Sequence, residues 1–165
     1  MNNDQYVFTT SYTFDAPRDL VWKAYTDAEQ LKRWFGPKDF PVFSSQLDLR
    51  PQGEYHYGMR GADGAEMWGK WVFREIEAPE KLVFVVHFSD AEGNITRHPG
   101  SKHWPLETLS TITFEEHQGK TTVKVKWEAL NATAQETQTF KDGSESMEMG
   151  LKGTFEQLAA YLKEL

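Results

Sequence analysis

The stretch "DGSESMEMGLKGTFEQLAAYLKE", residues 142–164, carries one apolar stripe close to the end of the chain. The stripe residues recur at spacings of 4, 4, 3 and 4, and they are Met147, Leu151, Phe155, Leu158 and Leu162. This spacing places them on one side of an α-helix. At about 1.5 Å per residue the helix would be roughly 30 Å long, enough to cross a whole domain. Such a helix needs an apolar surface to cover, and the preceding residues predict that surface.

Seven segments before the helix predict β-strands, because they are rich in β-branched and aromatic residues and are bounded by turn residues. They are residues 6–14, 42–49, 53–61, 66–77, 81–89, 107–116 and 120–130. In the last strand, "TVKVKW" alternates between apolar and charged side chains. Val123, Val125 and Trp127 fall on one face, and Lys124, Lys126 and Glu128 on the other. The sheet is therefore expected to have one dry face and one wet face.

Two short helices are predicted directly after the first strand, over residues 17–26 and 28–35. Asp15 is the expected N-cap of the first helix, with Pro17 in its first turn. A Thr-Asp pair predicts the start of the second helix. Residues 90–105 contain two Gly and two Pro and predict a loop. This order predicts a single α+β domain over residues 1–165, in which a curved antiparallel sheet wraps around the last helix.

The composition narrows the possible functions. The chain has 165 residues and a net charge of −7, which argues against binding to nucleic acids and to anionic membranes. It contains no cysteine, so neither a thiolate nucleophile nor a cysteine zinc site is possible. The first residues show no signal-peptide pattern, so a cytoplasmic location is expected. Aromatic residues reach 14%, and aromatic side chains often line small-molecule sites as well as cores.

Four segments, taken in order, resemble one protein family over nearly the whole chain. They are "FDAPRDLVWKAYTDAEQLKRWFGPKDF", "LDLRPQGEYHYGMRG", "REIEAPEKLVFVVHFSD" and "EMGLKGTFEQLAAYL". They resemble the activator of heat-shock protein 90 ATPase homologue-like (Aha-like) family of the START-like, Bet v 1-like (SRPBCC) superfamily. The chain departs from the usual family pattern at Phe35, at Gln52-Gly53 and at Leu151, where members commonly have Trp, Gly-Gly and Trp.

The resemblance implies a helix-grip fold, in which a seven-stranded antiparallel sheet cups the C-terminal helix and a hydrophobic cavity lies between them. Strand parity and the helical stripe then give the candidate lining of that cavity. The candidates are Trp34, Tyr55, Tyr57, Met59, Trp71, Phe73, Phe84, Phe88, Ile112, Phe114, Trp127, Met147, Leu151 and Phe155. The hydroxyls of Tyr55 and Tyr57 are its expected polar groups. The alternative is that these side chains fill an ordinary core without a void.

Two segments could close such a cavity. Trp34 and Phe35 precede a Gly-Pro turn and serve either as a structural plug or as a gate. The loop at residues 90–105 could form a second gate, with His98 and Trp104 among its notable residues. Three functions remain open at this point. The chain binds a small hydrophobic or aromatic molecule, or acts on a chaperone in the stress response as the family name implies, or is a cyclase-like or hydrolase-like enzyme.

Neither a metal site nor a catalytic site is predicted. The five histidines form no helical pair and no His-Glu-x-x-His motif, and they are His56, His87, His98, His103 and His117. Asp90, Glu92 and Asn94 begin like a calcium loop, but the twelfth position holds Ser101 in place of a bidentate Glu. No nucleophile elbow, phosphate loop or dinucleotide fingerprint occurs. We therefore expect no cofactor, and either a monomer or a homodimer.

Overall fold

The structure, a computed structural model, describes residues 6–165. Residues 1–5 of the predicted domain lie outside this range. The strands are β1 (Val7–Phe14), β2 (Val42–Leu47), β3 (Glu54–Arg60), β4 (Glu66–Glu77), β5 (Lys81–Ser89), β6 (Ile95–Thr96), β7 (Glu107–His117) and β8 (Lys120–Leu130). The helices are α1 (Arg18–Thr26), α2 (Ala28–Trp34), α3 (Ala134–Asp142) and α4 (Ser144–Leu162).

The strands form one antiparallel sheet in the order β1-β8-β7-β5-β4-β3-β2. These seven strands are the predicted ones. An eighth, the two-residue β6, pairs with β5 inside the segment predicted as a loop. Strands β7 and β8 are joined by Gln118 and Gly119, which both have positive φ, at 53° and 80°. Two such residues form the kind of turn whose twist matches a tight β-hairpin.

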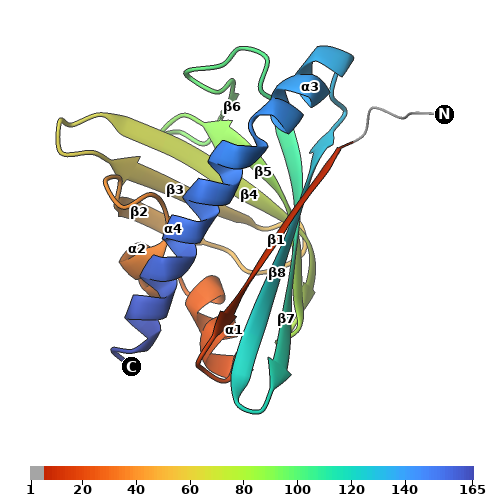
Figure 1. Cartoon of the computed structure of the whole chain (residues 1–165). Helices are drawn as coiled ribbons and strands as arrows, with labels where there is room; N and C mark the ends of the chain where they lie inside the picture. The colour runs from red at the N-terminus through yellow and green to blue at the C-terminus, as the bar shows by residue number, and fades with distance from the viewer. Residues whose placement is uncertain (1–5) are drawn as a thin grey trace.

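Helix α4 lies against the concave face of the sheet, as the helix-grip prediction requires (Figure 1). Its buried residues are Phe155, Leu158, Tyr161 and Leu162. The Phe155 ring contacts the rings of Tyr12 and Phe14 on β1, at centroid distances of 5.4 and 5.8 Å. Helices α1 and α2 gather near the C-terminal end of α4, and α3 lies near its other end (Figure 1). The predicted α+β helix-grip fold is confirmed.

The starts of the helices agree only in part with the sequence prediction. Pro17, not Asp15, is the N-cap of α1, so the predicted cap is wrong. The second cap is confirmed, because the Asp27 side chain accepts hydrogen bonds from the backbone of α2. Helix α3 was not predicted, although Thr133 and Glu136 form a capping box at its start. Gly143 ends α3, and α4 therefore begins at residue 144, two residues later than predicted.

The wet and dry faces follow the predicted alternation on β8. Lys124 and Lys126 are exposed, whereas Val123 and Val125 are buried. The central strand β5 departs from this rule, since its outward Val83, Val85 and His87 are buried as well. The residues leading into β7 reach this side of the sheet, where the Leu106 carbonyl oxygen lies 3.1 Å from His87 Nδ1. A carbonyl can only accept, so His87 carries its proton on Nδ1.

Candidate ligand cavity between the sheet and the C-terminal helix

A hollow of about 350 Å³ separates the concave face of the sheet from the N-terminal half of α4. This volume lies at the lower end of the range for small-molecule sites. Nineteen residues line it: Tyr25, Trp34, Phe35, Gly36, Pro37, Tyr57, Met59, Trp71, Phe84, Val86, Ser110, Ile112, Val125, Trp127, Met147, Gly150, Leu151, Thr154 and Phe155. None of these described residues carries a charged side chain.

The two halves of α4 explain why a space is left. All four buried residues of the helix, from Phe155 onward, lie in its C-terminal half. In the N-terminal half, the stripe residues Met147 and Leu151 are only partly buried, and Gly150 between them is exposed. The C-terminal half is therefore anchored in the core, while the N-terminal half covers the hollow without filling it.

Aromatic rings from the central strands form the floor of the hollow. The Trp71 and Phe84 rings stack at 4.1 Å with an interplanar angle of 17°. On β3, Tyr57 lies opposite Gly69 of β4. A Cβ added to Gly69 would stand 2.5 Å from the Tyr57 hydroxyl oxygen, so glycine is required for the ring to lie over its neighbour. The floor is thus a rigid, packed aromatic surface.

Four side-chain hydroxyl groups line the hollow, from Tyr25, Tyr57, Ser110 and Thr154, and that of Thr154 donates to the Gly150 carbonyl oxygen at 3.1 Å. Burial raises the pKa of both tyrosines far above the ordinary value, so they stay protonated. A hydrogen bond from the Trp71 side chain opposes part of this rise in the pKa of Tyr57. The Ser110 oxygen accepts a hydrogen bond of 3.0 Å from Trp127 Nε1.

The turn at residues 34–37 forms one side of the mouth. The Phe35 ring meets the rings of Tyr57 and Trp71 edge-on, at 5.2 and 5.3 Å. Gly36 follows with φ of +96°, a conformation that favours glycine. From α4, Gln157 Nε2 donates to the carbonyl oxygens of Trp34 and Gly36, at 3.0 and 2.6 Å. This amide fastens the turn to the helix.

Ten of the fourteen predicted residues surround the hollow. They are Trp34, Tyr57, Met59, Trp71, Phe84, Ile112, Trp127, Met147, Leu151 and Phe155. Trp34 also links α2 to α1, because its Nε1 donates a hydrogen bond to the Ala24 carbonyl oxygen at 3.0 Å. Phe35, predicted with it as plug or gate, lines the hollow at the mouth.

The other four predicted residues do not line the hollow. Tyr55 is completely buried, and its hydroxyl lies 3.1 Å from that of Ser45. Phe73 is buried against Phe84, at a ring distance of 5.9 Å.

Phe114 packs on Tyr25 of α1, at 5.3 Å, and is buried there. Phe88 packs on His98, at 4.7 Å. These residues have the predicted inward parity, but they lie at positions along their strands where other side chains fill the space.

Nine lining residues were missing from the predicted set: Tyr25, Phe35, Gly36, Pro37, Val86, Ser110, Val125, Gly150 and Thr154. Val86 and Val125 share parity with predicted residues. Ser110 had a visible signal, because a serine at an inward position beside Ile112 interrupts an apolar row. Tyr25 had no comparable signal, since only the packing of α1 against the sheet turns its ring toward the hollow.

The loop at residues 90–105 does not reach the hollow, because none of its described residues is among the lining. His98 instead packs between Phe88 and Trp104, at 4.7 and 6.0 Å. Trp104 continues to Phe140 of α3, at 5.5 Å. Arg97 adds an ion pair of 2.6 Å with Glu136. The loop is thus tied to α3, and the predicted second gate finds no support in the lining.

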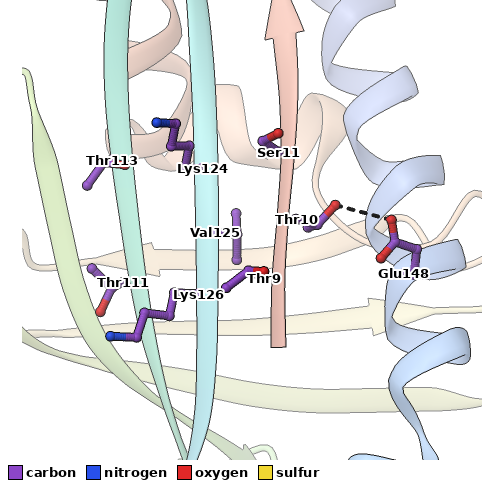
Figure 2. A pocket seen from close by; sticks show the side chains of 9 residues that line it. All are labelled: Thr9, Thr10, Ser11, Thr111, Thr113, Lys124, Val125, Lys126 and Glu148. Atoms are coloured by element: carbon purple, nitrogen blue, oxygen red, sulfur yellow. Dashed lines mark hydrogen bonds between the residues drawn. The ribbon is translucent and has the colours of Figure 1, made fainter. Parts of the chain in front are cut away.

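The outer face of the sheet carries a separate, shallow depression (Figure 2). Figure 2 shows Lys124 and Lys126 on β8 beside short hydroxyl side chains of β1 and β7. Both lysines are paired with carboxylates, Lys124 with Glu115 at 2.7 Å and Lys126 with Glu128 at 3.6 Å. The depression is therefore a solvated surface whose cations are already neutralised.

Two further features concern the part of the chain that the structure describes. Over residues 6–165, no group of three or more His, Asp or Glu side chains comes together as metal ligands would. In the same range, no helix has the length and apolar character needed to cross a membrane.

Comparison with known proteins identifies the family. The sequence model of the family described as "Activator of Hsp90 ATPase homolog 1-like protein" (AHSA1) matches residues 15–163. The chain belongs to the AHSA1 family. None of the curated proteins matches the chain in sequence. Leu151, one of the positions at which the chain departs from the residue that the resemblance implies for the family, lines the hollow.

Solved structures of other proteins share the fold. Protein Ms6760 from Mycobacterium smegmatis is 28% identical with a TM-score of 0.78, over 98% of this chain and 93% of that one. A protein from Arthrobacter aurescens is also 28% identical, with a TM-score of 0.80 over 96% and 87% of the two chains. The AHSA1 protein from Silicibacter pomeroyi is 17% identical, with a TM-score of 0.72 over 96% and 98%, and supports the fold alone.

Proposed function

We propose that this AHSA1-family chain is a binding protein that takes one small, uncharged, ring-bearing molecule into the hollow under α4. A single observation carries the proposal: the concave face and the N-terminal half of α4 border a hollow of about 350 Å³, partly open to solvent, that is lined by nineteen uncharged residues. Protein interiors normally pack to high density and leave few voids larger than a water molecule. A space of this size between well-packed elements is typical of a ligand site.

The binding energy would come mainly from removing apolar surface from water, at about 25 cal/mol per Å² before the costs of ordering are subtracted. The aromatic floor is already held in place by ring packing, as in the stack of Trp71 on Phe84. A preorganised floor lowers the ordering cost on binding. The absence of charged lining residues favours a neutral ligand, because a buried ion without a partner is strongly unfavourable.

The test uses the neutral fluorescent probe N-phenylnaphthylamine and two tryptophan variants of the same helix. Leu151→Trp places a larger side chain in the hollow, so the affinity for the probe should fall about tenfold or more. Met149→Trp is the matched control, because Met149 is 75% exposed and outside the lining, and its affinity should equal that of the wild type. Absence of saturable binding to the wild type, or equal loss in both variants, would refute the proposal.

The family description favours a second candidate, an interaction module that acts on a chaperone. Its test is the rate of ATP hydrolysis by heat-shock protein 90, measured with and without the purified chain. An unchanged rate over a range of concentrations would count against this function. The rate should be measured again with Leu151→Trp, because an effect that survives a filled hollow belongs to another surface of the molecule.

The enzyme alternative receives less support from the lining. Acid–base catalysis needs a group with a suitable pKa next to the substrate. Among the described residues around the hollow, the ionisable side chains are tyrosines alone, and burial raises the pKa of each. The buried His87 lies on the outer side of β5 and does not line the hollow.

A further inference from the structure

The side chains that line the hollow offer hydroxyl donors without matching hydrogen-bond acceptors. Tyr25 is 5% exposed and lines the hollow, yet no described residue within 6–165 accepts a hydrogen bond from its hydroxyl. Tyr57 also lines the hollow, and its hydroxyl likewise lacks an acceptor among residues 6–165. Among residues 6–165, the fully buried polar side-chain atoms without a partner are Arg18 Nε and Gln30 Oε1, so both tyrosine hydroxyls face the accessible space of the hollow and are not sealed in the core. A ligand that displaces water from this space must accept hydrogen bonds from them or leave them unpaired.

The contacts of the hydroxyl groups in the lining add to this excess of donors over acceptors. The Tyr57 ring lies beside that of Trp71, at a centroid distance of 6.2 Å, and the indole N–H can only donate, so Trp71 offers the Tyr57 hydroxyl no acceptor. Ser110 repeats the pattern, because its oxygen accepts from Trp127 Nε1 at 3.0 Å. A hydroxyl that accepts a hydrogen bond becomes a better donor in turn. Thr154 also lines the hollow, but its hydroxyl donates to the Gly150 carbonyl oxygen at 3.1 Å. The described lining thus offers hydroxyl protons from Tyr25, Tyr57 and Ser110, and no carboxylate or imidazole to receive them.

Nearby Tyr55 shows how the imbalance is avoided elsewhere. It precedes Tyr57 by two residues on β3, and the two rings stack at 5.1 Å. Its hydroxyl, however, is paired with Ser45 at 3.1 Å, and Ser45 also donates to the Ala28 carbonyl at 2.8 Å. The packed core therefore satisfies its tyrosine, and the hollow does not.

We infer that the ligand bears a neutral hydrogen-bond acceptor of the carbonyl class, received by the hydroxyls of Tyr25 and Tyr57, on an otherwise apolar ring system. This inference rests on the proposed binding function and specifies its ligand. A carbonyl oxygen has two lone pairs and no proton, so it can accept from both tyrosines and adds no donor to a site that lacks acceptors. A carboxylate would meet no cation in the lining, and its burial would be costly.

The experiment compares methyl naphthyl ketone with isopropenylnaphthalene, which has the same shape with a methylene group in place of the carbonyl oxygen. Dissociation constants are measured for the wild type, for Tyr25→Phe and Tyr57→Phe, and for the double variant. Tyr55→Phe is the matched control, because it removes a hydroxyl from the same strand without touching the hollow. The carbonyl stretching frequency of the bound ketone is recorded by infrared spectroscopy.

The wild type should bind the ketone about three- to tenfold more tightly than the alkene. Each single Phe variant should reduce this preference, and the double variant should remove it while its affinity for the alkene is kept. The carbonyl frequency should be lowered in the wild type and in Tyr55→Phe, and should return toward the apolar-solvent value in the double variant.

The possible failures are distinguishable. If both probes bind the wild type equally well, the acceptor inference is wrong and the binding function stands. The same holds if the preference survives in the double variant. If neither probe binds with saturation, the proposed function fails and the inference fails with it.

Discussion

The amide of Gln157 provides the sharpest test of how α4 closes the hollow. Its Nε2 donates to the carbonyl oxygens of Trp34 and Gly36, at 3.0 and 2.6 Å, and both bonds are partly buried. They join two segments more than 120 residues apart in sequence. Gln157→Leu keeps a side chain of comparable volume but removes both donors.

The expected cost follows from these two bonds. Each net hydrogen bond contributes about 0.5–1.5 kcal/mol to the free energy of unfolding, so losing two should cost about 1–3 kcal/mol. For a protein of this size that corresponds to a fall in the melting temperature of about 2–12 °C. Gln157→Glu should cost at least as much at neutral pH, since a carboxylate cannot donate and would face two carbonyl oxygens.

Chemical denaturation and thermal melting measure both variants. The matched control is Gln138→Leu, because Gln138 donates its single side-chain hydrogen bond, 2.8 Å to Asp142, on the exposed surface of α3. Its effect should stay within about 0.5 kcal/mol of the wild type. If Gln157→Leu changed the free energy of unfolding no more than this control, the amide would not fasten the turn to α4.

Three further predictions concern other parts of the molecule. Gly69→Ala should displace the Tyr57 ring into the hollow, which should lower the free energy of unfolding by about 1–3 kcal/mol and weaken probe binding. Unchanged probe binding in a titration would contradict the described aromatic floor. Burial lowers the pKa of His87 below its ordinary 6.5, so the unfolded chain binds more protons than the folded one once the pH drops through 6.5. The free energy of unfolding should therefore fall as the pH drops below about 6.5. In urea denaturation midpoints measured from pH 7 to 5, His87→Gln should make this fall smaller. The fall that remains should include the contribution of His98, whose pKa is also lowered. Thr133→Ala removes the side-chain cap of α3 and should cost about 1 kcal/mol, with faster amide exchange in the first turn of that helix as the local readout.

The local elements could largely be read from the sequence. The alternation of Val123, Lys124 and Val125 and the stripe through Phe155 determine which side of a strand or helix faces the core, because side-chain direction repeats every 2 residues in a strand and every 3.6 in a helix. Helix α3 was missed for a local reason, since its capping box precedes a sequence without a strong apolar stripe.

The hollow itself was decided by the tertiary structure. Parity places Tyr55 and Tyr57 on the same face, but only Tyr57 borders the space, because the hydroxyl of Tyr55 meets Ser45 on the neighbouring strand. Tyr25 joins them only because α1 packs across the sheet. The sequence by itself determined which side chains point inward. Whether an inward side chain packs against another side chain or borders the hollow depends on the curvature of the sheet and on where α4 is anchored. Both features arise from contacts between residues far apart in the chain.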